Sequence, residues 1–128
     1  MRRILALLGL FACAQPPEQI PKDELARWVA DVVCRRTAEC MRGTFESTFY
    51  GRSDCRATLE RDYGELVRSF DDAGCDYSAG AAGDAVIELD EMTCEQFYEG
   101  DGNEAVAEIW ADCGPTYPTY PTSYTYTM

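Results

Sequence analysis

The sequence predicts a small all-α bundle of about four helices, held together by three disulfides and preceded by an export signal. Apolar residues recur with the 3.6-residue period of a helix over most of residues 22–113, and no segment before residue 114 alternates with a period of two. Six of the seven cysteines lie in the same stretch, an even number that is typical of a disulfide framework in an exported protein. We therefore expect one helical six-cysteine domain and no strand before residue 114.

The N-terminus has the features of a signal peptide. Arg2 and Arg3 form a basic start, and Ile4–Ala12 is apolar but too short to span a bilayer. The sequence Leu10–Cys13 places a cysteine at the expected cleavage point and resembles a bacterial lipobox, whose cysteine receives a lipid. The resemblance implies that residues 1–12 are removed as a lipoprotein signal peptide. It also implies a diacylglycerol and an N-acyl chain such as palmitate on Cys13.

A second cleavage pattern leaves an alternative open. Ala12-Cys13-Ala14 also fits the signal of ordinary secretion, and cleavage after Ala14 would release a soluble secreted or periplasmic protein. In the lipoprotein interpretation, Ala14 stands where an aspartate would resemble an inner-membrane retention signal. The presence of Ala14 at this position therefore favours sorting to the outer membrane of a Gram-negative host. We expect a lipid-anchored protein of the bacterial cell envelope, with the soluble form as the alternative.

Residues 13–21 are predicted to form a tether behind the lipid. The stretch from Ala14 to Pro21 is polar, holds three of the six prolines and offers nothing to pack. Eight residues near polyproline geometry span about 25 Å. Such a tether would hold the folded domain off the membrane.

Two helices are expected in the first half of the domain. The first covers Asp23–Met41, after which Gly43 and the stretch 44–53 break the pattern. The second begins near Cys55 and stops at Ala73-Gly74. The apolar stripe of the first helix is Leu25, Trp28, Val29, Val32 and Val33, and that of the second is Cys55, Leu59, Tyr63, Leu66, Val67 and Phe70.

The second half predicts a weaker helix over 79–91 and a last helical region from residue 93. Thr93 and Gln96 have the spacing of a capping box, and Asp101 and Glu104 resemble a second one. Glycines at 100 and 102 interrupt the region, so one bent helix or two short ones are expected. The apolar stripe then resumes through Val106, Ile109, Trp110 and Cys113.

Residues 114–128 form a low-complexity tail of Thr, Tyr and Pro without charged residues. A disordered, partly extended tail is the expectation. Its four tyrosines leave open a contact strip for carbohydrate or for a partner protein.

The charge of the chain excludes one class of partner. Without Arg2 and Arg3, 9 basic and 23 acidic residues remain, which gives a net charge of −14. Binding to nucleic acid requires a basic surface, so no nucleic-acid partner is expected.

The chain offers little chemistry for catalysis or for binding metal. It has no histidine, and its single lysine, Lys22, follows the tether. No Cys-x-x-Cys pair is present, and the run Asp101–Glu104 does not continue as a calcium loop, because Ala105 and Val106 follow. We therefore expect no catalytic residue, no metal site and no cofactor.

The large aromatic residues of the domain allow two interpretations. They lie on core-facing helical positions and either form the core itself or line a pocket for an apolar ligand. The first interpretation is favoured, and the second makes a carrier of an apolar small molecule the alternative function. These residues are Trp28, Tyr63, Phe70, Phe97 and Trp110.

Helix geometry suggests a disulfide connectivity among the six cysteines. Cys34 and Cys40 lie about 9 Å apart along one helix, too far for a bridge. If the first two helices form an antiparallel hairpin, the end of the first faces the start of the second. A third helix that climbs about 20 Å and a fourth that returns would then bring the remaining cysteines to matching levels. The predicted pairs are Cys40–Cys55, Cys34–Cys94 and Cys75–Cys113.

The combined pattern resembles a known group of proteins. The lipobox, the Pro-rich tether, Cys34-x5-Cys40, the cysteine opening the second helix and Cys75-Asp-Tyr77 are similar to the small, uncharacterised cysteine-rich lipoproteins common in myxobacteria. The resemblance covers about residues 1–113 and implies no activity. The expected function is that of a lipid-anchored, non-catalytic binding or structural module, with an envelope or extracellular protein as its partner.

Overall fold

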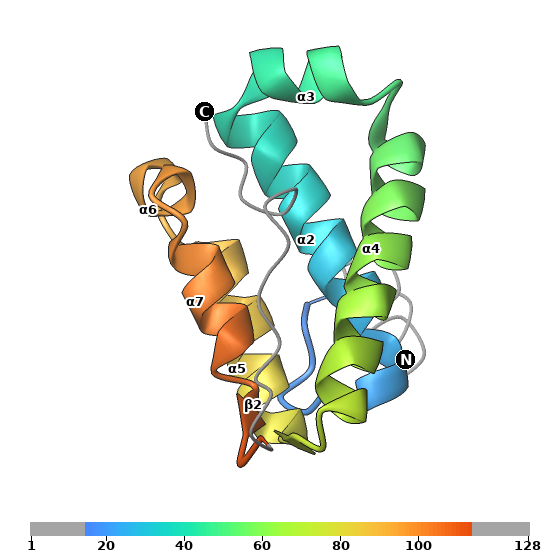
Figure 1. Cartoon of the computed structure of the whole chain (residues 1–128). Coiled ribbons are helices and arrows are strands. Elements are labelled where there is room, and N and C mark those ends of the chain that lie inside the picture. The colour runs from blue at the N-terminus through green and yellow to red at the C-terminus, as the bar shows by residue number, and fades with distance from the viewer. Residues whose placement is uncertain (1–14, 114–128) are drawn as a thin grey trace, which may run out of the picture.

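A computed structural model describes residues 15–113 and shows a helical domain, which confirms the all-α prediction (Figure 1). Cys13, the signal peptide and the Thr/Tyr/Pro tail lie outside the described residues. Within them, six helices and one pair of two-residue strands follow in this order: α2 (Lys22–Cys40), α3 (Arg42–Thr48), α4 (Arg52–Asp72), β1 (Asp76–Tyr77), α5 (Ala79–Glu91), α6 (Cys94–Tyr98), α7 (Asp101–Ala107) and β2 (Trp110–Ala111).

Helix α2 is the central element of the bundle. It runs antiparallel to α4 on one side and contacts α5 and α6 on the other, while α7 packs against α5 and α6 (Figure 1). Helix α3 lies across the end of the α2–α4 pair. The predicted first three helices are confirmed, and the third has the expected bounds of 79–91.

The buried faces of α2 and α4 explain why these two helices pair. Their buried residues follow spacings of three and four, so each helix turns one apolar stripe toward the other. The buried members are Leu25, Val29, Ala30, Val32, Val33, Cys34 and Thr37 on α2, and Cys55, Leu59, Tyr63, Leu66 and Phe70 on α4.

The stretch 44–53 departs from the prediction, because it is not simply a break. Residues 42–48 form helix α3, and Phe45 and Phe49 are buried with their ring centroids 5.6 Å apart. Two apolar residues four apart are enough to fix one short helix when they close the end of a bundle. They are too few to give a recognisable period in the sequence.

The C-terminal region of the domain consists of two short helices. The predicted capping box is present: the Gln96 amide donates to Thr93 Oγ1 at 3.1 Å, and the Thr93 amide donates to Gln96 Oε1 at 2.9 Å. The second predicted box is wrong, because α7 follows Gly100 in a left-handed conformation (φ 87°) without a side-chain cap. A glycine adopts that backbone conformation at little cost.

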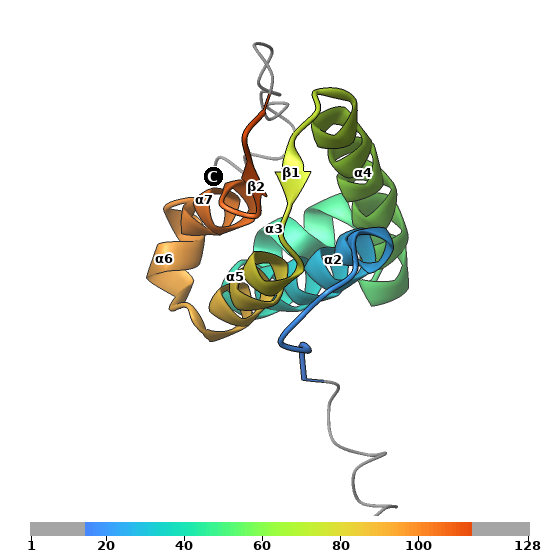
Figure 2. The same cartoon turned by 90° about the horizontal axis from the view of Figure 1, so that it is seen from below.

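The expectation that helix continues to Cys113 and that no strand precedes residue 114 is also wrong. Helix α7 ends at Ala107, and Trp110–Ala111 pairs antiparallel with Asp76–Tyr77. The two strands lie side by side in Figure 2. Two residues on each side are too short for an alternating pattern, so only the return of the chain to this end of the bundle creates the pair.

Most of the predicted core aromatics are in the core. Tyr63, Phe70 and Trp110 are all buried, and the Phe70 and Trp110 rings stack with centroids 4.8 Å apart and planes 3° from parallel. Trp28 and Phe97 are only partly buried. The stacked pair joins the end of α4 to β2, so Phe70 and Trp110 are part of the core.

No helix within residues 15–113 is both long enough and apolar enough to cross a bilayer. The three disulfides of the domain, described below, are typical of exported proteins and are rare in the cytosol.

Candidate functional site

The end of the predicted tether is part of the folded domain. Ile20 is completely buried, its amide donates to the carbonyl of Ala79 at 3.1 Å, and its own carbonyl accepts from the Tyr77 hydroxyl at 2.7 Å. Residues 17–20 are called the strap below. Figure 2 shows the chain approaching α2 past the start of α5. The strap is therefore held by one backbone–backbone hydrogen bond, by one hydrogen bond from the Tyr77 side chain, and by the burial of Ile20.

Gly83 on α5 makes this docking possible. A Cβ on Gly83 would stand 2.8 Å from the carbonyl oxygen of Pro17 and would come closer still to the carbonyl of Glu18. Only a residue without a side chain lets the strap backbone lie directly on the helix. The expectation that the stretch from Ala14 to Pro21 offers nothing to pack is therefore wrong for the strap.

The disulfides differ in part from the predicted connectivity. Cys75 is bonded to Cys113, as predicted, and this bond closes the end that holds the two short strands. The other two predicted pairs, Cys40–Cys55 and Cys34–Cys94, are wrong. The structure has Cys34–Cys55, with Cα atoms 5.9 Å apart, and Cys40–Cys94, with Cα atoms 5.3 Å apart.

The difference between the predicted and the observed partners of Cys34 and Cys40 has two physical causes. Six residues along a helix turn the side chain by about 600°, so Cys34 and Cys40 point in directions about 120° apart. One direction faces α4 and the other faces α6. In addition, α3 separates the end of α2 from the start of α4, so Cys55 does not lie level with Cys40. The predicted pairs follow from the positions of the cysteines along the helix axes alone. The direction in which each side chain points around its helix decides the observed pairs.

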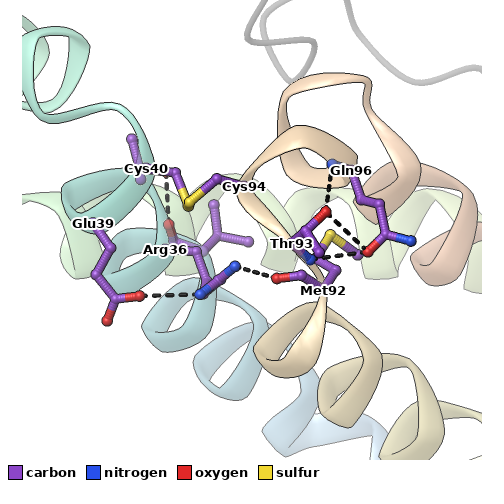
Figure 3. Close-up of a disulfide and its surroundings, with 9 residues drawn as sticks. Arg36, Glu39, Cys40, Met92, Thr93, Cys94 and Gln96 are labelled. Atoms are coloured by element: carbon purple, nitrogen blue, oxygen red, sulfur yellow. Dashed lines mark hydrogen bonds and ion pairs between the residues drawn. A yellow bond between two sulfur atoms is a disulfide. The ribbon is translucent and has the colours of Figure 1, made fainter.

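The Cys40–Cys94 bond lies in a polar setting at the junction of α2, α5 and α6 (Figure 3). The Arg36 guanidinium donates to the carbonyl of Met92, the residue that follows α5, and to Glu39 Oε2 at 3.1 Å. Cys94 itself is exposed, whereas Cys34 and Cys55 are completely buried. The three bonds therefore differ in their accessibility to a reductant.

One groove lies on the surface shared by α2 and α4. It encloses about 500 Å³ and combines one aromatic side chain with two cations and two carboxylates. We call it the Trp28 groove. Its lining residues are Arg27, Trp28 and Asp31 of α2 and Arg56 and Glu60 of α4.

The Trp28 side chain presents a carbon surface to the groove. Trp28 Nε1 is buried and has no hydrogen-bond partner among the described residues. Because Nε1 is the only polar atom of the indole, the exposed part of this partly buried ring is carbon. Arg56 Nη1 lies 3.5 Å from Asp31 Oδ1 and bridges the two helices beside the ring.

A second hollow, of about 320 Å³, lies between α5 and the start of α7 and is acidic. Asp101, the first carboxylate of the run Asp101–Glu104, stands in the first turn of α7. Within residues 15–113, no three Cys, Asp or Glu side chains come together as a metal site. The lining residues are Asp84, Ile87, Glu88, Glu91, Met92, Gln96 and Asp101.

The remaining reactive groups have structural partners. Lys22 Nζ lies 2.5 Å from Asp71 Oδ1, which ties the start of α2 to the end of α4. Burial, with a smaller contribution from the nearby Asp23 carboxylate, raises the pKa of Tyr77 to about 12. A tyrosine shifted in this direction keeps its proton and remains a hydrogen-bond donor to the strap.

Comparison with protein-family models, with curated proteins and with solved structures gives no match to this chain.

Proposed function

We propose that the protein is a lipid-anchored module of the bacterial cell envelope that acts by binding or by structural presence rather than by catalysis. The observation that carries the proposal is the position of Cys13, which ends a lipobox and lies just before the strap. The pattern of the whole sequence is similar to that of the cysteine-rich lipoproteins of myxobacteria, and this similarity supports the same function. Ala14, in place of an aspartate, supports the outer membrane as the destination.

The docked strap changes how far from the membrane the domain would sit. Four residue steps separate Cys13 from Pro17, so a fully extended chain spans at most about 14 Å between them. A free tether ending at Pro21 would reach about 25 Å even in polyproline geometry. A lipid on Cys13 would therefore hold the start of α5 close to the headgroups.

A role without catalysis is supported by the chemistry of the side chains. The whole sequence has no histidine, and its one lysine is paired with Asp71. The six domain cysteines are consumed in three disulfides, so none of them is a free thiol. The chain therefore lacks the Ser–His and Cys–His nucleophile pairs and the histidine that usually acts as general base near neutral pH.

The test is metabolic labelling with an alkyne-bearing palmitate in a Gram-negative host. The natural chain should incorporate the label and fractionate with the outer membrane. Cys13→Ser should lose the label and accumulate with its signal peptide attached, whereas Ala14→Ser, the matched control, should keep both label and location. A Cys13→Ser protein that is soluble and trimmed to Gln15 would show ordinary secretion instead.

A further inference from the structure

We propose that the Trp28 groove binds the neutral part of an envelope glycan, with one sugar ring stacked on the exposed carbon surface of Trp28. This inference rests on the binding role proposed above and gives it a site and a ligand class. Three properties of the groove lead to it: an aromatic carbon surface, a rim of donors and acceptors, and the absence of net charge.

The aromatic surface selects a ligand with an apolar face. The indole N–H is turned inward, so hydrogen bonding cannot come from the ring, and contact with it is through carbon. A gluco-configured pyranose ring has such faces, because its axial C–H bonds project above and below the ring while its equatorial hydroxyls project outward around the edge. Stacking of that face on Trp28 would leave the hydroxyls directed toward the rim.

The rim supplies both kinds of hydrogen-bonding group. Arg27 and Arg56 carry only donors, and the carboxylates of Asp31 and Glu60 carry only acceptors. A sugar hydroxyl donates and accepts at once, and a pair of neighbouring hydroxyls matches the spacing of a guanidinium fork or of a carboxylate. Asp31 and Arg56 lie against each other at 3.5 Å, so the ligand would use their remaining acceptor and donor sites together with those of Arg27 and Glu60.

The balance of charge argues for a neutral ligand. Two cations and two carboxylates line the groove, on a chain whose net charge is −12. A polyanion or a polycation would gain from one pair and be repelled by the other. An apolar ligand would cover the four charged groups without replacing their hydration, which is costly.

The two sides of the groove are fixed before any ligand arrives. Cys55, the neighbour of Arg56, is bonded to Cys34 on α2, and both cysteines are completely buried. The helices that carry the rim are thus joined covalently within two turns of Trp28. A preformed site loses less conformational entropy on binding than a flexible one.

The test is a titration of the full-length lipidated protein with maltotriose and with the trimer of N-acetylglucosamine. The protein is held in a phosphocholine detergent, since a sugar-headed detergent would compete. Indole N–H signals in a ¹H–¹⁵N spectrum follow the two tryptophans separately. The Trp28 signal should shift saturably with at least one trimer, while the Trp110 signal of the buried stack stays in place.

Variants separate stacking from a general change in fold. Trp28→Ala should weaken the affinity at least about tenfold, Trp28→Phe should retain most of it, and Glu60→Gln should weaken it by a smaller factor. The thermal transition of each variant reports its folding. A Trp28 signal unmoved by both trimers, or moved only by a cationic peptide, would overturn the glycan site. The labelling of Cys13 would be unaffected by either outcome, so the two proposals fail separately.

Discussion

Glu18 and Gly83 are in direct backbone contact, and the space in which a side chain on Gly83 would lie is occupied by the Glu18 carbonyl. This contact joins the segment before α2 to the middle of α5, 65 positions further along the chain. It makes the strap part of the domain. The distance between the domain and any lipid on Cys13 therefore depends on one glycine.

Gly83→Ala should release the strap from α5. The added Cβ cannot fit beneath the Pro17 and Glu18 carbonyls. The burial of the Ile20 side chain and the two hydrogen bonds of its backbone should therefore be lost together. Exposure of one large aliphatic side chain and loss of two hydrogen bonds corresponds to about 2–4 kcal/mol of unfolding free energy. Urea denaturation measures the loss, and hydrogen exchange at the Ile20 amide locates it.

Gly80→Ala on the same helix is the matched control. A Cβ at Gly80 meets no atom within 4 Å, and alanine is the better helix former by up to about 1 kcal/mol. This variant should be as stable as the natural chain or slightly more stable. Equal losses at both positions would mean that the loss at Gly83 does not come from its contact with the strap.

Tyr77 should make the fold sensitive to alkaline pH. Because the folded pKa of about 12 lies above the ordinary value of 10.0, the folded state keeps a proton that the unfolded state releases. This contribution to stability is complete below pH 10 and is lost as the pH rises through 12. Urea midpoints measured between pH 9 and 12 should fall with pH.

Tyr77→Phe is the corresponding variant. It removes the bond to the Ile20 carbonyl at all pH values and should lower the free energy of unfolding by about 0.5–1.5 kcal/mol near neutral pH. Its stability should then depend less on pH above 10 than that of the natural chain. An identical alkaline slope in the two proteins would assign the effect to other tyrosines.

The Cys40–Cys94 disulfide should open before the Cys34–Cys55 disulfide under mild reductant. Cys94 is exposed and Cys40 partly so, whereas Cys34 and Cys55 are completely buried, and thiol attack requires access to sulfur. Alkylation followed by peptide mapping should find Cys40 and Cys94 modified first, in a protein that is still folded. Early modification of Cys34 would contradict the assigned burial.

Removal of the Cys40–Cys94 disulfide should lower the free energy of unfolding. It closes a loop of 54 residues, for which chain entropy predicts a contribution of about 4 kcal/mol. The double variant Cys40→Ser/Cys94→Ser should therefore unfold at lower urea concentration. The same mapping without reductant checks the pairing itself, because it should recover Cys34 joined to Cys55.

Arg36→Met should weaken the attachment of the end of α5 to α2. The Arg36 guanidinium is mostly buried and bonds to the Met92 carbonyl, where a positive charge also complements the C-terminal end of the helix dipole. Loss of a charged hydrogen bond of this kind corresponds to about 1.5–3 kcal/mol. Arg42 is exposed and, within residues 15–113, its ion pair is with Glu46 on its own helix, so Arg42→Met should change stability by less than about 0.5 kcal/mol.

The long helices were predictable because their periodic apolar stripes are local properties of the sequence. The apolar stripe of Leu59, Tyr63 and Leu66 predicts α4, and the capping box of Thr93 and Gln96 predicts the start of α6. Helix α3 and the two short strands were not predictable, because each depends on contacts with distant segments. The Trp28 groove was missed for a related reason: Trp28 continues an apolar stripe, but α4 covers only part of it.

The sequence by itself determined the helical class, which follows from the local period of apolar residues, and the even set of six domain cysteines, and it predicts an export signal. The tertiary structure decided which cysteines pair, how the strap docks on Gly83 and where a groove opens between α2 and α4. These outcomes depend on the rotation of each helix about its axis and on the close approach of backbones far apart in sequence. A helical period fixes which residues share a face, but only packing fixes what that face meets.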